Sequence, residues 1–321
     1  MYRLSGWRRW YKAWLRKGRV PDLPMWESFY PPMDWEANKA TWPHASHSQF
    51  VRISGQTWHV QIMGNGPPLL LLHGTGASTH SWRDLMLPLA REFTVVAPDL
   101  PGHAFTALHA DKGPSLFNVT AGLHELLLRL KLWPQAILGH SAGAAVAAQL
   151  ILNAPECPTP VLIGLNPAWL PLPGLANWLF PPAAKLLALS PFSAHLFAHQ
   201  AKKSSAVRKL MDSTGSRLDD AALSYYQRLL QSPTHIKGVL SLMAAWNLDN
   251  LAGRLKHLSG PVFLHLGGND RTVPSSMSRD ACRLIPQAVA ITVPGLGHLA
   301  HEEAPEATSE QVIAWIRHFS A

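Results

Sequence analysis

One stretch, AILGHSAGAAVAAQL over residues 136–150, limits the possible folds of this chain more than any other. It begins with a short apolar run typical of a buried strand and ends with an alanine-rich run typical of a helix. Between the two runs the chain must turn sharply within Gly139–Gly143. The two glycines permit this, because glycine allows a close approach of backbone to backbone. The stretch therefore predicts a strand, a tight turn with Ser141 at its apex, and a helix.

This turn has two interpretations, a packing joint of small residues or a device that exposes a nucleophile. Its sequence fits G-x-S-x-G, the nucleophile elbow, in which a strained backbone exposes a serine hydroxyl at the carboxyl end of a sheet. The five-residue pattern alone is a modest signal, since glycine is a common residue. The preceding strand and the following helix are the context that the functional interpretation requires. We therefore take Ser141 as the candidate nucleophile.

A serine hydroxyl is a weak nucleophile, and it needs a base that is in turn oriented by a carboxylate. The elbow architecture holds these partners in the order serine, aspartate or glutamate, histidine. Asp270 follows a predicted strand in FLHLGGNDRTVP, and His298 follows the next one in ITVPGLGHLAHEE. Both would lie at carboxyl ends of strands, where open α/β sheets hold their sites. The sequence thus predicts a catalytic triad of Ser141, Asp270 and His298.

Alternatives exist for both partners of the serine. Asp270 could be a turn-forming aspartate, which is common beside glycine. His301 is the other candidate base, but His298 follows Gly297 directly and lies nearer to the strand end. Asp99 is a competing carboxylate, for which we expect a structural role because it falls on the strand before the elbow.

Acyl transfer also requires N–H donors for the developing oxyanion. The segment LLHGTG, residues 71–76, follows the first buried strand, and its backbone N–H groups can turn inward. We predict an oxyanion hole formed by the N–H groups of Thr75 and Ala142. The alternative is an ordinary tight turn, and we expect His73 to be a hydrogen-bonded structural residue.

Short apolar runs alternate with helical patterns along most of the chain. The sequence QFVRISGQTWHVQIMG, from Gln49, predicts an antiparallel hairpin. The alternation that follows predicts the α/β class, with a mostly parallel, doubly wound sheet. The expected strands cover residues 69–72, 94–97, 136–138, 161–165, 262–266 and 289–293, and the expected helices cover 81–91, 115–130, 142–153, 275–284 and 305–319.

The interval from about residue 166 to 258 shows no convincing strand and is too long for a loop. We therefore expect an inserted helical cap that lies over the sheet. The expected organisation is a basic amphipathic helix over 1–20, a surface linker over 21–48, the first part of the core over 49–165, the cap over 166–258, and the second part of the core over 259–321.

Composition and charge exclude several classes of protein. The 321 residues are 47% hydrophobic and 15% charged, as in a folded globular protein. Residues 1–20 hold seven basic residues and no acidic one, so they supply most of the net charge of +8 and no nucleic acid partner is expected. No apolar run is long enough for a transmembrane helix, and two cysteines suit a reducing compartment. We expect a cytoplasmic protein with no metal site and no cofactor.

Residues 1–20 have the pattern of an interfacial helix. At about 100° per residue, Trp7, Trp10 and Trp14 gather on one face, and most of the basic residues gather on the other. Indole rings lie well at headgroup level while Lys and Arg meet anionic lipid, so this pattern predicts peripheral attachment to the inner face of a membrane. The open alternatives are a helix docked on the body or on a partner, and a basic tail.

The motifs together resemble those of the α/β-hydrolases, over residues 49–319. More narrowly, LLLLHGTGASTHSW, FTVVAPDLPGH, GHSAGAA and STGSRLD are similar to the magnesium-chelatase accessory proteins of bacteriochlorophyll synthesis. The resemblance implies an α/β-hydrolase fold and a role in photosynthesis, alongside the insertion of magnesium into protoporphyrin, with magnesium chelatase as a partner. One departure is Ala104, where related hydrolases often have a second glycine.

The insertion is rich in proline, leucine and aromatic residues, as expected for a lid over an apolar pocket. We predict that Trp169, Trp178 and Phe192 line this pocket and contact a porphyrin-like substrate. Two classes of function remain: a serine hydrolase acting on an ester of an apolar substrate, which includes a general esterase, and a tetrapyrrole-binding accessory protein without catalysis. The serine in the elbow excludes hydrolases of this fold that use a carboxylate nucleophile.

Overall fold

The computed structural model describes residues 33–109, 112–171, 186–187, 190 and 192–320. The chain divides into two compact units, Met1–Pro31 and Pro32–Ala321, and the described residues belong to the second. The predicted helix over 1–20 and the first part of the predicted linker therefore lie outside the described residues. None of the helices in the described ranges has both the length and the apolar character needed to span a bilayer.

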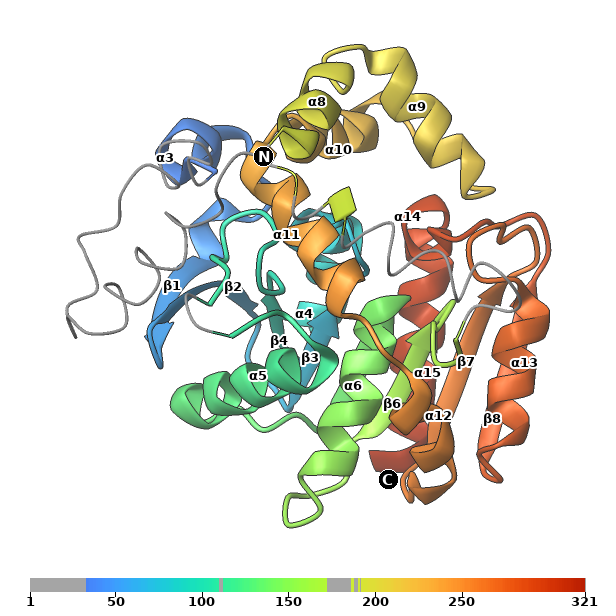
Figure 1. Ribbon diagram of the computed structural model, residues 1–321. Coiled ribbons are helices and arrows are strands. Elements are labelled where there is room, and N and C mark those ends of the chain that lie inside the picture. Colours follow the sequence, from blue (N-terminus) through green and yellow to red (C-terminus); the bar gives the residue numbers. More distant parts are fainter. Residues whose placement is uncertain (1–32, 110–111, 172–185, 188–189, 191, 321) are drawn as a thin grey trace, which may run out of the picture. The chain divides into compact units, whose positions relative to one another are not determined.

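A single eight-stranded sheet forms the centre of the second unit, in the order β1-β2-β4-β3-β5-β6-β7-β8 (Figure 1). β2 runs antiparallel to both of its neighbours, and the pairs from β4 to β8 are parallel. This confirms the predicted α/β class with an antiparallel hairpin at its start. The strands are β1 Ser48–Ile53, β2 Gln56–Met63, β3 Pro68–Leu72, β4 Thr94–Pro98, β5 Ala136–His140, β6 Val161–Leu165, β7 Val262–Gly267 and β8 Ala288–Val293.

The hairpin closes with a two-residue turn between the paired residues Ile53 and Gln56. Ser54 and Gly55 both have positive φ, 47° and 83°. Two positive φ values in succession are the mark of a type I′ turn, whose twist matches that of the flanking strands. The Ser-Gly pair in the sequence therefore fixes the register of β1 against β2.

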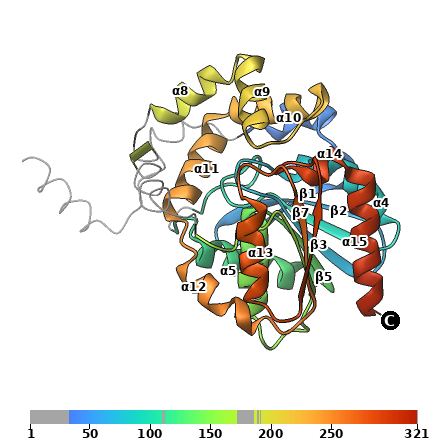
Figure 2. The same ribbon diagram turned by 90° about the vertical axis from the view of Figure 1, so that its right-hand side faces the viewer.

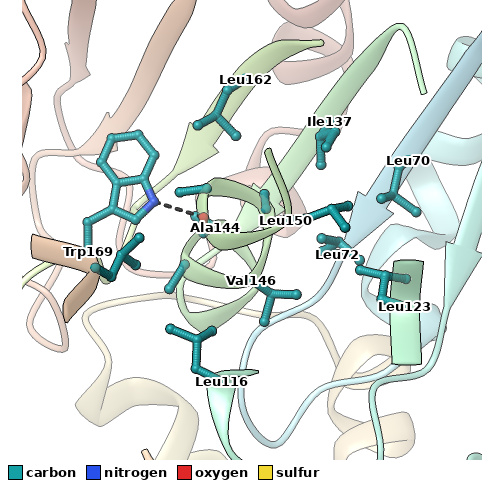
Figure 3. Close-up of a cluster of buried hydrophobic side chains, with 14 of the residues drawn as sticks. Leu70, Leu72, Leu116, Leu123, Ile137, Ala144, Val146, Leu150, Leu162 and Trp169 are labelled. Atoms are coloured by element: carbon teal, nitrogen blue, oxygen red, sulfur yellow. Dashed lines mark hydrogen bonds between the residues drawn. The ribbon is translucent and has the colours of Figure 1, made fainter. Parts of the chain in front are cut away.

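Helices cover both faces of the sheet, as the strand–helix alternation predicts. Figure 2 shows α5, α12 and α13 on one side of the strands and α4 and α15 on the other. The helices of this layer arrangement are α4 Arg83–Ala90, α5 Leu116–Leu130, α6 Ala142–Asn153, α12 Asp249–Arg254, α13 Ser275–Arg283 and α15 Pro305–Ser320, with the short η3 Thr79–Trp82, η4 Leu255–His257 and α14 Ala300–Glu303 between them. α6 follows β5 directly and packs against α5 in the largest apolar cluster of the described residues, which includes Leu70, Leu72 and Leu123 (Figure 3).

The described part of the insertion consists of helices, as predicted, but the predicted range 166–258 is too long at its end: Leu251 of α12 and Leu255 of η4 are buried in the core among the helices that cover the sheet. The helices of the cap are α8 Ser193–Gln200, α9 Ser204–Ser213, α10 Asp220–Leu230 and α11 Pro233–Ala245. Both views show them gathered at one edge of the sheet (Figures 1 and 2). A buried carboxylate links this cap to the core: Glu302 accepts the hydroxyl of Tyr226 from α10 at 2.6 Å, and it pairs with Arg83 at 2.7 Å.

The described part of the predicted linker is not a free surface segment. Residues 35–47 form α3 Trp35–Asn38 and the 3₁₀ turns η1 Lys39–Thr41 and η2 Ala45–His47. The side chain of Trp42 is buried, and its ring lies edge-on to Phe105 at 4.9 Å between ring centroids. Tryptophan carries a large apolar surface, so a segment with such a residue gains more from packing on the core than from remaining in solvent.

Candidate active site

Ser141 lies at the apex of the predicted turn, between the end of β5 and the start of α6. Its backbone has φ 52° and ψ −117°, and its side chain does not cap the helix. Such a conformation costs a residue other than glycine energy and persists only where the surroundings enforce it. Here Ser141 N–H donates to the carbonyl of Leu165 at 3.0 Å, and the Ser141 carbonyl accepts the N–H groups of Ala144 and Ala168 at 3.1 Å.

Both glycines of the turn are required by close backbone contacts. A Cβ added at Gly143 would lie 2.0 Å from the carbonyl oxygen of Leu72, in the neighbouring strand β3. One added at Gly139 would lie 2.5 Å from Cα of Ala144, in the first turn of α6. Since real Cβ atoms do not approach other atoms so closely, the pattern G-x-S-x-G is a steric requirement of this joint.

Asp270 and His298 meet at the carboxyl ends of β7 and β8. His298 Nδ1 lies 2.7 Å from Asp270 Oδ2, and both side chains are buried. The other carboxylate oxygen accepts the N–H groups of Thr272 at 2.8 Å and Val273 at 2.9 Å. Because Nδ1 donates to the carboxylate, a neutral His298 carries its lone pair on Nε2, the nitrogen that a general base uses.

Each of the neighbouring strands β5, β6, β7 and β8 is followed by one residue of this site. Ser141 follows β5, Asp270 lies in the turn after β7, and His298 lies in the turn after β8. Asn166, which follows β6, is a residue that sequence reasoning missed. Parallel strands bring their carboxyl ends to one edge of the sheet, so four segments far apart in the sequence become neighbours.

Asn166 uses its whole amide to hold the turn that carries His298. Its Nδ2 donates to the carbonyls of Gly297 at 3.0 Å and His298 at 2.8 Å, and its Oδ1 accepts the N–H of Gly267 at 2.7 Å. Its backbone also has positive φ, 44°, which asparagine tolerates better than most residues. The signal available in the sequence was the polar Asn-Pro pair directly after a buried strand.

The loop after β3 passes directly beside the nucleophile. A Cβ added at Gly74 would lie 3.1 Å from Cβ of Ser141. His73 Nε2 accepts the N–H of Leu100 at 2.9 Å, so Nδ1 carries the proton and donates to the carbonyl of Gly74 at 2.8 Å. A peptide unit is planar and trans, so this bond also fixes the opposite direction of the Thr75 N–H. His73 is therefore structural, as expected, and it sets the orientation of a predicted oxyanion donor.

A second buried histidine, His235 from the cap helix α11, supports the same loop. Its Nδ1 accepts the N–H of Ala104 at 3.0 Å, and its Nε2 therefore donates to the carbonyl of Gly76 at 3.2 Å. Burial lowers the pKa of His235 to about 4, so the ring stays neutral and keeps this pattern of donor and acceptor at neutral pH. Sequence reasoning did not single out this residue.

His140 and His301 surround His298 without replacing it. The His140 ring lies 4.8 Å from the His298 ring and 4.5 Å from the His301 ring, between ring centroids. His140 Nε2 donates to the carbonyl of His298 at 2.9 Å, whereas His301 Nε2 donates to the hydroxyl of Ser81 at 2.8 Å. It is His298, and not His301, that contacts Asp270. Burial holds the pKa values of His140 and His301 well below the ordinary value, so both remain neutral neighbours.

Asp99 has partners of its own, in line with the expected structural role. Its Oδ2 lies 2.7 Å from Nδ1 of His59, and its Oδ1 accepts the N–H of Thr79 at 2.7 Å. Burial by itself would raise the pKa of this carboxyl group, but the His59 ring and the N–H donor outweigh it and hold the pKa below its usual value. The ionised Asp99 thus joins β2 to the segment after β3.

The three residues predicted to line the pocket have different positions. Trp169 is fully buried in the core, where its indole N–H donates to the carbonyl of Ala144 at 2.8 Å (Figure 3), so it supports the first turn of α6 instead of lining an open pocket. Phe192 is 72% exposed at the start of α8. Trp178 lies outside the described residues.

A group of potential metal ligands in the described residues lies far from Ser141. The ligand atoms of His124, Glu156 and Cys157 lie within 4.8 Å of one another. Glu156 and Cys157 follow the carboxyl end of α6, whereas Ser141 precedes its first residue, so about 18 Å of helix separates them. This group therefore has no part in the chemistry at Ser141.

Comparison with known proteins identifies the fold and the family of this chain. The family model of the α/β hydrolase fold matches residues 67–305. The magnesium-chelatase 30 kDa subunit of Rhodobacter capsulatus is 39% identical over 286 residues, which are 88% of this chain and 99% of that protein. The sn-1-specific diacylglycerol lipase ABHD11 of Mus musculus is 28% identical over 263 residues, which are 78% of this chain and 81% of that protein.

Solved structures show the same fold. An α/β hydrolase fold protein from Burkholderia ambifaria superposes with a TM-score of 0.70 at 24% identity, and the match covers 83% of this chain and 97% of that one. An esterase from Exiguobacterium antarcticum superposes with a TM-score of 0.69 at 16% identity, and the match covers 84% of this chain and 99% of that one. The chain therefore belongs to the α/β hydrolase fold family, and within it to the family of the magnesium-chelatase 30 kDa subunit.

Proposed function

We propose that this protein is a serine hydrolase that acts on an ester or a related bond of an apolar, tetrapyrrole-related substrate, as an accessory factor to magnesium insertion in bacteriochlorophyll synthesis. One observation carries the proposal: Asp270 Oδ2 holds His298 Nδ1 at 2.7 Å, at the same sheet edge as the strained Ser141. Strain that is maintained by so many contacts supports a chemical role, since a turn used only for packing would gain nothing from it.

In the proposed reaction, Ser141 Oγ attacks the carbonyl carbon of the ester while His298 Nε2 accepts the hydroxyl proton. The carbonyl oxygen becomes an oxyanion and accepts hydrogen bonds from the N–H groups of Thr75 and Ala142, each worth about 3 kcal/mol of barrier. His298 returns the proton to the leaving alcohol as the ester C–O bond breaks, and the acyl group stays on Ser141. A water molecule that the same imidazole deprotonates then releases the acid and restores the serine.

Two observations support the proposed substrate class: the similarity to a magnesium-chelatase subunit and the exposed apolar side chains of the cap. The 39% identity to a magnesium-chelatase 30 kDa subunit supports a role beside the chelatase, which we propose as a partner. Large apolar side chains are exposed at the start of the cap, where Leu186 and Phe192 are each 72% exposed and Leu196 is 58% exposed. These side chains are close in the sequence, and large exposed apolar surface marks binding sites. We propose that a flat apolar tetrapyrrole binds beneath the cap, with Trp178 and Phe192 among its contacts.

Two other functions use the same fold. The relative's description as a subunit favours a protein that binds a tetrapyrrole without cleaving it. The similarity to a diacylglycerol lipase favours a general esterase with no connection to pigments. Labelling of the serine and titration with protoporphyrin, followed by tryptophan fluorescence, together separate all three functions.

A fluorophosphonate probe should label the purified protein at Ser141, because the probe reacts with serines that an adjacent base activates. Ser141→Ala should abolish labelling, while Ser213→Ala, at an exposed serine of α9, should label as the wild type does. Saturating protoporphyrin or its magnesium form should slow labelling at least about tenfold, since it would occupy the site. Mass spectrometry of the labelled peptide and a time course of labelling give both results.

Each outcome of this experiment selects one function. Labelling that protoporphyrin does not slow would leave the general esterase. Saturable quenching of tryptophan fluorescence by protoporphyrin, with no labelling of the folded protein, would leave the non-catalytic binding protein. Absence of both responses would overturn the proposed function.

We propose that residues 1–20 attach the protein to an anionic membrane surface, where a sparingly soluble substrate collects. Full-length protein should float with liposomes that contain anionic lipid at low salt and float less at high salt, because each basic residue near the surface contributes about 1 kcal/mol. A protein that starts at Pro21 should stay at the bottom of the gradient and keep its reaction with the fluorophosphonate. If both proteins stay at the bottom, the segment does not bind membranes.

A further inference from the structure

The loop that joins α9 to α10 in the cap crosses both turns of the proposed triad. We infer that its residues Thr214–Ser216, the cap clamp, position the Asp270–His298 pair, and that Ser216 is the positioning side chain. This inference rests on the proposed function, since it concerns the geometry of the same site. Among the described residues, the clamp forms no hydrogen bond with Ser141, so its effect must pass through the two turns.

A single carbonyl of the clamp binds both turns. The carbonyl oxygen of Thr214 accepts the N–H of Arg271 at 3.1 Å and the N–H of His298 at 3.3 Å. Arg271 directly follows Asp270. The two turns follow different strands and bond to each other directly, through the Asn269 N–H and the Leu296 carbonyl at 2.8 Å. The shared acceptor adds a second link beside the residues of the triad and so restrains one turn relative to the other.

The next two residues of the clamp add one bond to each turn. The carbonyl of Gly215 accepts Nδ2 of Asn269 at 2.6 Å, on the Asp270 side. The hydroxyl of Ser216 accepts the N–H of Leu299 at 2.7 Å, on the His298 side. Ser216 is 1% exposed, so its hydroxyl has no competing water, and the Leu299 N–H would lose its partner if the hydroxyl were removed.

The backbone of the clamp fits closely against both turns. Gly215 has φ 86°, and a Cβ added to it would lie 2.0 Å from the carbonyl oxygen of Asn269. A Cβ added at Gly297 would lie 2.3 Å from the backbone nitrogen of Ser216. Glycine is therefore required on both sides of the contact. These distances explain why the segment STGS has glycine at its centre.

Together these bonds fix the backbone on both sides of the His298 Cα. The clamp binds the N–H of His298 and that of Leu299, while Asn166 and His140 bind the carbonyl of His298. Only the two side-chain torsions of His298 are then left free, and the hydrogen bond to Asp270 fixes the orientation of the ring. A base that must lie within a fraction of an ångström of its productive position is held most firmly in this way.

The test replaces Ser216 with alanine and uses Ser213→Ala as the matched control. Ser213 is the last residue of α9 and directly precedes the clamp, but it is exposed, and its hydroxyl donates to the carbonyl of Leu210 within the same helix. In Ser216→Ala we expect the rate of fluorophosphonate labelling and the turnover of an activated ester to fall roughly 10- to 100-fold with little change in KM, because misplacement by about 1 Å costs about that much. Ser213→Ala should match the wild type.

A second measurement does not depend on catalysis. The proton shared by His298 Nδ1 and Asp270 should give a low-field ¹H NMR resonance in the wild type and in Ser213→Ala, and this resonance should shift or broaden in Ser216→Ala. Asn269→Ala, which removes the bond on the Asp270 side, should change the same resonance if Ser216→Ala folds poorly. Normal labelling, turnover and resonance in folded Ser216→Ala and Asn269→Ala would overturn the inference. If the wild type resists the probe while its low-field resonance still shifts or broadens in Ser216→Ala, only the hydrolase function is overturned.

Discussion

Replacement of His298 by alanine should lower the turnover of an activated ester by roughly 10⁴- to 10⁶-fold, nearly as much as the loss of Ser141, because nucleophile and base act as one unit. No other histidine can take over the role of His298, because within the described residues it is the His298 ring that contacts the Asp270 carboxylate. KM should change little, since the imidazole acts on the reacting atoms. Steady-state kinetics with a chromogenic ester measures the loss.

The matched control is His301→Ala, which removes a buried histidine of the same size three residues away. Its ring contacts Ser81 and the His140 ring, so its loss should cost stability but less than about tenfold in turnover. The loss of turnover in Asp270→Asn should lie between the losses in His298→Ala and His301→Ala, because Asn166 and the cap clamp still hold the turn of His298. Unchanged turnover in His298→Ala, or an equal loss in His301→Ala, would contradict the triad as assigned.

The fold could be predicted in most of its detail because each strand and helix has a local cause. The apolar runs, the Ser-Gly hairpin turn and the small residues around Ser141 each act within a few positions of the sequence. The structure confirms the strands, the order of the helices and the inserted cap. It also extends β5 by two residues, to His140, since the strand continues directly into the elbow.

What the sequence did not reveal is set by contacts between distant segments. Asn166, His235 and Ser216 support the site through backbone groups that lie 131, 159 and 83 positions away in the chain, and no local pattern marks such a pairing. The predicted position of Trp169, in the wall of a pocket, was wrong for a related reason. An aromatic residue after a strand suits a pocket wall and a buried core equally, and only the position of the Ala144 carbonyl distinguishes them.

Mild acid should destabilise this protein strongly, because its interior holds many neutral histidines. Burial lowers the pKa of each of six fully buried or nearly fully buried histidines, in several of them well below the ordinary value of 6.5; the six are His73, His80, His103, His140, His235 and His301. In the unfolded chain these rings would bind protons near pH 6.5, whereas in the folded protein they stay neutral. The unfolded state therefore binds more protons below pH 6.5, and stability falls as pH falls.

The size of this effect is comparable to the whole stability of a domain. A histidine that stays neutral in the folded state costs about 1 kcal/mol of stability between pH 7.5 and 5.5, so several such histidines cost several kcal/mol. Typical free energies of unfolding are about 5–15 kcal/mol. Glu302 acts in the opposite direction, since burial raises its pKa and its folded form binds a proton earlier as pH falls. One such group offsets only a small part of the loss.

Urea unfolding at pH 7.5, 6.5 and 5.5 measures this prediction, and the midpoint should fall steeply over the series. His103→Asn keeps the donor that His103 Nδ1 directs at the carbonyl of Pro101 and removes the ring that titrates. This variant should therefore lose about 1 kcal/mol less than the wild type between pH 7.5 and 5.5, whatever its stability at pH 7.5. His257→Asn, at an exposed histidine, should keep the wild-type pH dependence. A wild-type midpoint that is the same at pH 7.5 and 5.5 would show that the buried rings accept protons in the folded state, and that the neutral hydrogen-bond pattern of His73 and His235 around the proposed oxyanion loop is not maintained.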